Sequence, residues 1–232
     1  MLCWFGATGA RMIEIRSVRS DDLDALYRIA LATGDGGADA AALYRDPKLL
    51  GHIYAAPYAV LCPETVFVAE DADGVGGYIV GAADTPAFEA RLEAEWWPRL
   101  RATYAEPADV PQADWTLDQR RIRTIHHPRR TPSEITSTYP SHLHINLLPA
   151  LRGRDVGRRL MGRWLQAIRQ FGSPGAHLAV GRDNTRAIRF YTACGFRELT
   201  RLPHPVAGAA WFGVTLPQGA EPPRRGTPKA RH

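Results

Sequence analysis

The sequence predicts one α/β (α+β) domain built on a mixed, twisted sheet of about six to seven strands that is flanked by helices. Two observations predict this class. Two short apolar runs joined by a turn indicate an antiparallel hairpin, and a later strand–helix–strand–helix succession indicates parallel strands joined by a crossover. A helical insertion at residues 85–140 separates the two patterns and precedes the fourth strand. The chain has 232 residues, 45% of them hydrophobic, so it can bury one substantial core.

The spacing of apolar residues assigns the elements before the insertion. Residues 13–18 alternate as a strand does, and the helix that starts after Ser20 is stopped by Gly34. The elements expected next are helical stretches at 39–44 and 49–54, a strand at 65–70, a turn at 71–77 and a partner strand at 78–83.

Regular spacing returns after the insertion. The expected elements are a strand at 142–148, a helix at 156–171, a strand at 177–181, a helix at 185–193 and final strands at 196–202 and 211–216. Gly195 stands where a glycine commonly ends a helix. The core face of the first of these helices is expected to carry Val156, Leu160, Trp164, Ile168 and Phe171.

The insertion is too long to be a plain connection between two strands. Helices are expected at 86–104 and 117–125, with prolines punctuating the rest. We interpret the segment as a lid or wall over a site, or as a simple insertion. Trp96, Trp97 and Trp115 either line a pocket or seal the inserted helix onto the core, and the sequence does not decide between these roles.

Charge and composition exclude several partners. The net charge is +5, but residues 217–232 hold four basic and one acidic side chain, so the remainder is nearly neutral and no nucleic-acid partner is expected. No apolar run approaches the roughly 20 residues of a membrane span, so no membrane partner is expected. Three scattered cysteines are too few for a disulfide framework or a zinc site. We therefore expect no metal and a cytoplasmic location.

These features divide the chain into three parts. Residues 1–11 form an N-terminal extension in which no secretory signal is expected, and Met12 is an alternative start. Residues 12–216 form the domain. Residues 217–232, rich in proline and basic side chains, are expected to be a disordered tail.

An arginine- and glycine-rich turn joins the strand at 142–148 to the next helix. Its glycines let a ligand approach the backbone, and the first helical turn carries unpaired N–H groups and a partial positive charge. These features favour an anion site suited to a pyrophosphate. The candidate residues are Arg152, Gly153, Arg154, Asp155, Val156, Gly157 and Arg158, and Arg159 adds a further cation. A tight turn with solvated arginines is the alternative, and the turn alone does not exclude it.

Asp155 opposes the anion site. A carboxylate ~5 Å from a phosphate costs roughly 3 kcal/mol at an effective dielectric near 20. Asp155 could instead cap the following helix by accepting hydrogen bonds from its first N–H groups. Residues 152–159 still carry a net charge of +3, which favours anion binding on balance.

A second motif decides the interpretation of the turn. Residues 184–196 read N-x-x-A-x-x-F-Y-x-x-x-G-F and follow the turn by about 30 residues. Together the two motifs closely resemble the GNAT superfamily of acyl-CoA N-acyltransferases, and the order of elements extends the resemblance over roughly residues 12–216. Residues 139–148 and 182–196 are also loosely similar to the acetyltransferase-like domain of O-GlcNAcases. The insertion at 85–140 is not typical of the superfamily.

The resemblance implies roles for particular residues. It implies a GNAT-like fold, with the turn from Arg152 to Gly157 binding the pyrophosphate of acetyl-CoA. The backbone of Leu147 and Leu148 would pair with the pantetheine amides, and Asn184 and Tyr191 would hold the pantetheine arm and protonate the leaving thiolate. Asp155 stands where the superfamily usually has Gly or Ala.

The chemistry of Tyr191 agrees with that role. A free tyrosine has a pKa near 10 and a thiol near 8.5, so a phenol can protonate a developing thiolate. The alternative is a core aromatic on a short helix. Cys194 could be an acyl-accepting nucleophile, but no partnered base is visible near it, and packing as a small hydrophobe is favoured.

The strand at 142–148 offers candidates for a general base. His142, His144 and Asn146 alternate and so share one face of the strand. Histidine titrates near neutrality, and we select His144 because it lies nearer the end of the strand. The alternative is a half-buried structural histidine.

We therefore expect an N-acetyltransferase that moves an acetyl group from acetyl-CoA to a primary amine by direct attack, with Tyr191 as general acid. The alternative is a catalytically inactive module that binds CoA or a protein partner. The acceptor is expected to be a small-molecule or peptide amine that the sequence does not identify, and a homodimer stays open.

Overall fold

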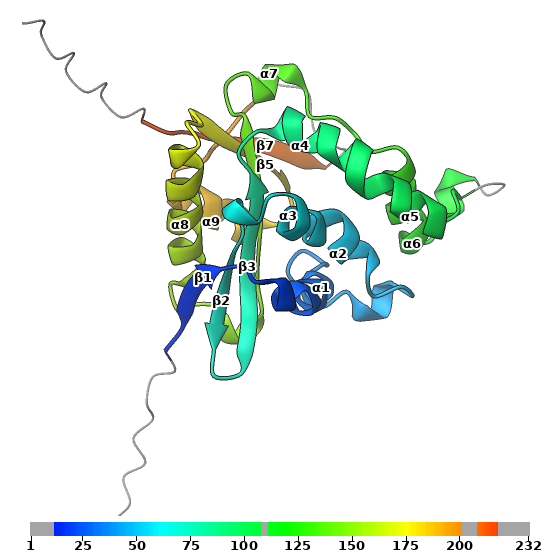
Figure 1. Ribbon diagram of the computed structural model, residues 1–232, viewed down its shortest axis with the longest axis horizontal. Coiled ribbons are helices and arrows are strands. Elements are labelled where there is room, and N and C mark those ends of the chain that lie inside the picture. The colour runs from blue at the N-terminus through cyan, green and yellow to red at the C-terminus, as the bar shows by residue number, and fades with distance from the viewer. Residues whose placement is uncertain (1–11, 108–110, 201–207, 218–232) are drawn as a thin grey trace, which may run out of the picture.

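The computed structural model describes residues 12–107, 111–200 and 208–217. Seven strands form one mixed sheet in the order β1-β2-β3-β4-β5-β7-β6 (Figure 1). The strands are β1 (Glu14–Ser17), β2 (Phe67–Asp71), β3 (Gly74–Ala82), β4 (Ser141–Leu147), β5 (Gly175–Gly181), β6 (Arg197–Glu198) and β7 (Ala209–Thr215). The α-helices are α1 (Leu23–Ala32), α2 (Leu49–Tyr54), α3 (Ala56–Leu61), α4 (Thr85–Arg91), α5 (Trp97–Thr103), α6 (Leu117–His126), α7 (Ser133–Thr136), α8 (Val156–Gln170) and α9 (Thr185–Ala193).

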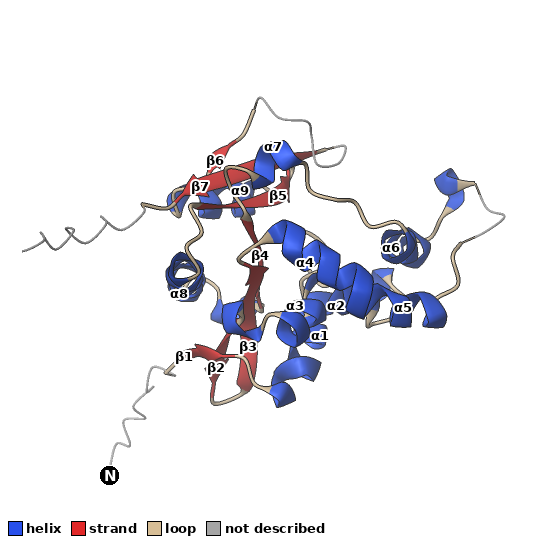
Figure 2. Ribbon diagram, turned by 45° about the horizontal axis from the view of Figure 1, so that its top comes forward, coloured by secondary structure: helices blue, strands red, loops and turns tan. Residues whose placement is uncertain are grey.

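Helices cover both faces of the sheet, and each face has its own core. α8 lies against one face, where Leu160, Trp164 and Ile168 are fully buried. α1 to α5 gather on the opposite face, as Figure 2 shows. The predicted class is confirmed: a seven-stranded mixed sheet carries an early hairpin of β2 and β3, and α8 is the crossover between β4 and β5.

The insertion is helical, as predicted. α4 and α5 are joined by a π-helical segment, Leu92–Trp96, into one run that ends at Thr103, and α6 follows close to its expected place. Asp84 starts the run by accepting a hydrogen bond from the Ala87 N–H at 2.9 Å. Figure 1 shows this region as a layer beside α1 and α2, away from α8.

Some predicted elements are wrong. Residues 39–44 hold only a single 3-10 turn at Ala41–Leu43. α3 was not predicted, although Pro57 lies at its start, where proline is tolerated. β3 begins at Gly74 rather than at residue 78, because Gly74 has a φ of 97° and closes a tighter turn than expected.

Phe171 is also placed wrongly by the sequence. It is 55% exposed, just beyond the last residue of α8, so it is not part of the core. Of the strand expected at 196–202, the structure has the short β6, and residues 201 and 202 lie outside the described part. The extension at 1–11 and the tail from 218 also lie outside it, so the proposed division of the chain stays a prediction.

The sheet splits along its middle. β4 and β5 are parallel but pair over only two positions, Ser141 with Ala176 and His142 with His177. Beyond these pairs β4 follows β3 as far as Leu147, whereas β5 follows β7 as far as Gly181. The two strands therefore diverge, and one side of the second half of β4 is left open.

Candidate active site

A cavity of about 860 Å³, called here the cleft, occupies the split between β4 and β5. Residues 143–147, residues 179–181 and the N-terminal ends of α8 and α9 line it. Backbone groups on an antiparallel strand alternate between its two sides. Since the Leu148 N–H donates to the Gly76 carbonyl at 2.9 Å, the Leu147 N–H points away from β3 and toward the cleft. Of the two predicted leucines, Leu147 lines the cleft, whereas Leu148 uses its N–H in the sheet.

The predicted anion turn lies at one wall of the cleft. Gly153 and Asp155 have φ values of 71° and 59°, and α8 begins directly after them at Val156. A Cβ at Gly157 would lie only 3.1 Å from the Phe190 ring, so glycine lets α8 and α9 approach each other. The first N–H groups of α8 thus border the cleft, an arrangement that favours an anion.

Asp155 does not cap α8 with its side chain. It occupies the N-cap position in a left-handed conformation, and its carboxylate makes no capping hydrogen bond. The capping interpretation is therefore wrong. This conformation costs a non-glycine residue roughly 1–2 kcal/mol. The carboxylate lies 3.8 Å from the Arg158 guanidinium, and both side chains are two-thirds exposed.

The arginines of the turn have different environments. Arg152 donates to the carbonyls of Leu147 at 2.9 Å and Gly37 at 2.6 Å, so it ties β4 to a loop after α1. Burial, together with the positive charge of Arg186, lowers the pKa of Arg152. The residues of the predicted set that line the cleft are Arg152, Gly153, Asp155, Val156, Gly157 and Arg158, and Arg154 is not among them. Arg159 donates to the Ile13 carbonyl at 2.9 Å.

Asn184 and Tyr191 both line the cleft. Asn184 caps α9, because its Oδ1 accepts a hydrogen bond from the Ala187 N–H at 3.1 Å. The Tyr191 ring lies two turns along the same helix and contacts Phe190 and Phe196 edge-on, at centroid distances of 5.4 and 5.9 Å. Burial raises the pKa of Tyr191, so the phenol stays protonated at neutral pH.

Cys194 follows the same helix as its C-cap and packs against the core around α8. Burial raises the pKa of its thiol, which disfavours the nucleophilic thiolate. Packing as a small hydrophobe, the interpretation favoured from the sequence, agrees with this environment.

The sequence analysis missed a loop that forms a further wall of the cleft. Thr33, Gly34, Gly36 and Gly37 line the cleft together with α9. A Cβ at Gly37 would lie 1.9 Å from the Arg186 guanidinium, so the loop and α9 are in direct contact. The signal for this loop is the run of three glycines around Asp35 directly after α1.

A second cavity of about 690 Å³, called here the side cavity, lies between the sheet and the insertion. It meets the cleft at a junction that both cavities share. The junction is formed by Tyr54, Arg121, Leu143, His144 and Ala179. Ligands in the two cavities would therefore both border His144.

His142 and His144 have different environments. The ring nitrogens of His142 are both hydrogen-bonded, to the Tyr58 hydroxyl at 2.8 Å and the Thr85 hydroxyl at 2.7 Å. His144 contacts the rings of Tyr54 and Tyr58 at 5.5 and 5.7 Å and makes no hydrogen bond to another described residue through its ring. His142 is thus a structural histidine, whereas His144 faces the junction.

Burial keeps these imidazoles neutral. It lowers the pKa of His144 to about 4, with a contribution from neighbouring His177, and it lowers the pKa of His142 well below its usual value. His177 is 2% exposed, and its Nδ1 lies 2.6 Å from the Tyr139 carbonyl oxygen. A neutral imidazole has a free lone pair that can accept a proton, but its lowered pKa also makes it a weaker base than a free histidine.

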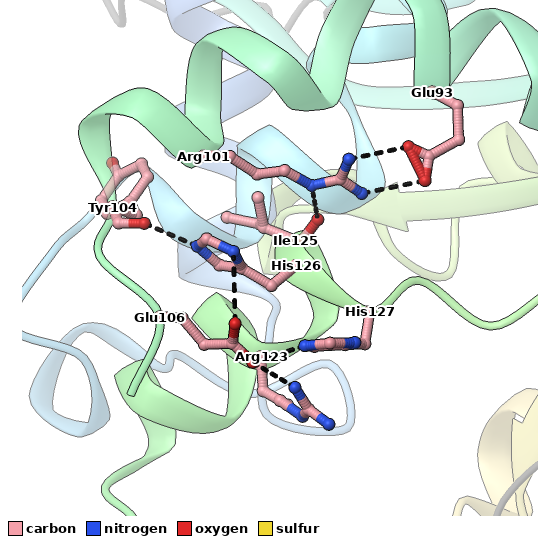
Figure 3. Close-up of polar contacts among 8 residues, drawn as sticks. All are labelled: Glu93, Arg101, Tyr104, Glu106, Arg123, Ile125, His126 and His127. Carbon is pink, nitrogen blue, oxygen red and sulfur yellow. Dashed lines mark hydrogen bonds and ion pairs between the residues drawn. The ribbon is translucent and has the colours of Figure 1, made fainter. Parts of the chain in front are cut away.

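Ion pairs hold the insertion in place as the outer wall of the side cavity. Figure 3 shows Arg101 paired with Glu93 at 2.9 Å and donating to the Ile125 carbonyl at 3.0 Å. In the same view Glu106 contacts both Arg123 and His127. These contacts join α5 to α6.

The tryptophans of the insertion divide between the two roles that the sequence left open. Trp96 is 4% exposed and donates from Nε1 to the His52 carbonyl at 2.9 Å, so it seals the inserted helix onto the core. Trp97, 3% exposed, is buried in the same core and also lines the side cavity, and Trp115 lines that cavity as well.

Within the described ranges, no group of three or more His, Cys, Asp or Glu side chains is placed to hold a metal ion. Among the same residues, no helix is both long and apolar enough to span a membrane.

Comparison with known proteins agrees with this geometry. Residues 46–196 match the Acetyltransferase (GNAT) family. The crystal structure of SsHAT superposes with a TM-score of 0.80 at 36% identity, covering 88% of this chain and 98% of that one. The chain therefore belongs to the GNAT acetyltransferase family, as the two motifs predict. That family uses acetyl-CoA and an acceptor.

More distant relatives share parts of this picture. Protein O-GlcNAcase of Rattus norvegicus is 23% identical over 194 residues, which are 83% of this chain but 21% of the relative, so the chain spans about a fifth of its length. The GCN5-like protein acetyltransferase Rv2170 of Mycobacterium tuberculosis is 27% identical over 182 residues, covering 75% of this chain and 82% of that protein. The structure of yncA from Salmonella typhimurium with acetyl-CoA has the same fold, with a TM-score of 0.53 at 17% identity over 91% of this chain and 98% of that one.

Proposed function

We propose that this chain transfers the acetyl group of acetyl-CoA to a primary amine by direct attack. The cleft would hold the cofactor, with the N-terminal turn of α8 facing the pyrophosphate and the Leu147 backbone facing the pantetheine arm. Three features support this fit. The split sheet leaves backbone groups open, Gly153 and Gly157 keep side chains away from the turn, and the cleft is large, at about 860 Å³.

The acceptor amine would approach through the side cavity. Its nitrogen attacks the thioester carbonyl carbon, and the Leu147 N–H stabilises the negative charge that develops on the oxygen. The C–N bond forms as the C–S bond breaks. His144, which is neutral at the junction, takes the proton from the amine nitrogen. Tyr191 returns a proton to the departing thiolate.

The observation that carries this proposal is that two proton-transfer groups line the same cleft. His144 borders both cavities, and Tyr191 borders the cleft with a phenol that burial keeps protonated. Neither group is used in a hydrogen bond to another described residue.

Changing Tyr191 to Phe tests the proposed acid. We expect turnover to fall on the order of a hundredfold, since general acid catalysis typically contributes a factor of 10² to 10⁴, while the dissociation constant of acetyl-CoA stays within about twofold. Steady-state kinetics and calorimetry measure the two quantities. Tyr139→Phe is a matched control, because Tyr139 lines neither cavity. Unchanged turnover of the Tyr191 variant excludes the role.

Asp155 favours a second candidate function, a CoA-binding module without catalysis. Its exposed carboxylate borders the cleft beside the anion turn, where it opposes phosphate. Calorimetry with acetyl-CoA and with CoA, followed by an acetyl-transfer assay on a panel of amines, separates the two functions. Binding without transfer or thioester hydrolysis favours the module.

The proposal includes a cytoplasmic location, since Cys62 and Cys194 are both free thiols.

A further inference from the structure

Arg121 has an environment that differs from those of the neighbouring arginines. It lies on α6 at the junction of the two cavities and is partly buried. Its guanidinium donates to the Tyr44 hydroxyl at 3.1 Å and to the Tyr54 hydroxyl at 2.9 Å, and it also lies over the Tyr54 ring. None of these partners is a carboxylate.

Two other arginines of the insertion show the contrast. Arg101 is paired with Glu93, and Arg123 with Glu106 (Figure 3). Within the described residues, no carboxylate lies within ion-pair distance of Arg121. A cation withdrawn from water without an anionic partner is costly, and this one faces two cavities that a ligand can enter.

The side cavity as a whole favours an anion. Among the described residues that line it, five are arginines and two are glutamates. Both glutamates have partners, because Glu93 pairs with Arg101, and Glu89 accepts hydrogen bonds from the Thr131 N–H and hydroxyl at 2.9 and 2.8 Å. The remaining walls are largely aromatic and include Tyr58, Phe88 and Trp97.

The spacing connects Arg121 with the proposed reaction. The Tyr54 ring contacts both groups, with the Arg121 Cζ 5.6 Å from its centroid and the His144 ring 5.5 Å from it. An anionic group held by Arg121 would therefore place the rest of a small molecule near the ring that also contacts His144.

We propose that Arg121 binds a carboxylate of the acceptor, so that the substrate is an amino compound that also carries a carboxylate. The planar guanidinium suits this group because it can donate two parallel hydrogen bonds to the two oxygens. This inference rests on the proposed function, but the cation site itself can be tested without catalysis.

The test compares binding of 3-phenylpropionate with binding of its neutral amide, 3-phenylpropanamide, to the full chain saturated with CoA. Neither probe carries an amine, so calorimetry reports on the site even if no acetyl transfer occurs. We expect the carboxylate to bind at least about tenfold more tightly, since a hydrogen bond to a charged group contributes roughly 1.5–3 kcal/mol.

In Arg121→Gln this preference should fall to about one, while the affinity for acetyl-CoA stays unchanged. Arg169→Gln is the control, because Arg169 is an exposed arginine on α8 that lines neither cavity, and it should keep the preference. Arg121→Lys retains the charge without the planar guanidinium and should keep part of the preference for the carboxylate. This variant provides the test if Arg121→Gln does not fold.

Four outcomes would overturn the proposal. The first is equal binding of the two probes to the unmodified chain, including no measurable binding of either. The second is a preference that survives in Arg121→Gln. The third is that Arg121→Gln loses affinity for acetyl-CoA but still prefers the carboxylate probe, which would mean that Arg121 binds the cofactor. The fourth is inorganic phosphate displacing 3-phenylpropionate at lower concentration than acetate does, which indicates a phosphate-bearing acceptor.

An activity assay then extends the result to the substrate. Phenylalanine should be acetylated with at least about tenfold higher kcat/KM than phenylalaninamide or phenethylamine, and Arg121→Gln should remove the difference. A carboxylate preference in binding combined with no acetylation of any amine would contradict the proposed function and leave the anion site standing.

Discussion

The cleft and the side cavity meet at His144, yet they are built in different ways. The cleft is formed largely by backbone: diverging strands, the first turns of α8 and α9, and glycines at positions where a Cβ would intrude. The side cavity is formed by side chains from an insertion whose helices are joined by individual ion pairs. A site made from backbone depends on the fold, whereas a site made from side chains can change without changing the fold. The proposed cofactor site thus depends on the fold, and the proposed acceptor site on individual side chains.

The largest expected effect lies in the wall of the side cavity. His177 borders the side cavity, and burial lowers its pKa to about 4. In the unfolded chain its pKa is near 6.5, so between pH 6.5 and 4 the unfolded state binds more protons and stability falls as the pH falls. The contribution of His177 over this window is about 3 kcal/mol.

Urea unfolding at a series of pH values measures this loss. His177→Gln should flatten the pH dependence by up to that amount, and His127→Gln, at an exposed site, is the control. An unflattened profile in the His177 variant would mean that the loss of stability at low pH does not depend on this neutral imidazole.

Gly157→Val tests whether cofactor binding in the cleft requires the close approach of the α8 backbone that glycine permits. The new Cβ would lie 3.1 Å from Phe190 and beside the proposed phosphate position, so acetyl-CoA affinity should fall on the order of 50-fold, or roughly 2.3 kcal/mol. Gly162→Val on the same helix is the control, because no atom lies within 4 Å of the Cβ built there. Equal affinities in the two variants would remove the turn from the cofactor site.

Asp155→Gly should have a smaller effect of opposite sign. Glycine adopts a φ of 59° without strain, and the change removes a carboxylate that opposes phosphate. Because Asp155 is two-thirds exposed, solvent screens its charge, and we expect acetyl-CoA to bind a few-fold more tightly. The midpoint temperature of thermal unfolding should rise by a few degrees, in line with roughly 1 kcal/mol of relieved backbone strain. Asp155→Asn isolates the charge and should improve binding without the full gain in stability.

Glu106→Gln should have the smallest effect. The carboxylate contacts Arg123 and His127 in an exposed cluster, and solvent screens ion pairs at the surface so that they contribute little. Stability should fall only slightly, and less at high salt, while acetyl-CoA affinity stays unchanged. A large loss of cofactor affinity would contradict the separation of the two cavities.

The sequence predicted the cleft better than the side cavity for the same physical reason. The glycine turn at 152–157 and the motif at 184–196 are local, and their backbone geometry follows from their own residues. The loop at Gly36 and Gly37 was missed because its contact with Arg186 joins segments about 150 positions apart. The role of Arg121 depends on which neighbouring arginines form ion pairs with glutamates. The spacing of residues along a helix does not predict these pairs. The prediction that the Asp155 side chain caps α8 was wrong, because the backbone at Asp155 is left-handed.

The split between β4 and β5 also decides which molecules can reach an open strand edge. An exposed strand edge is a template on which another chain can add a strand. Here the open edge of β4 is in the interior of the sheet, facing β5 across the cleft and bordered by α8 and α9. A second folded chain cannot bring a strand to it, but a thin linear molecule with amide groups can. The fold therefore keeps a strand-pairing surface that a long, narrow ligand can use and that protein aggregation cannot.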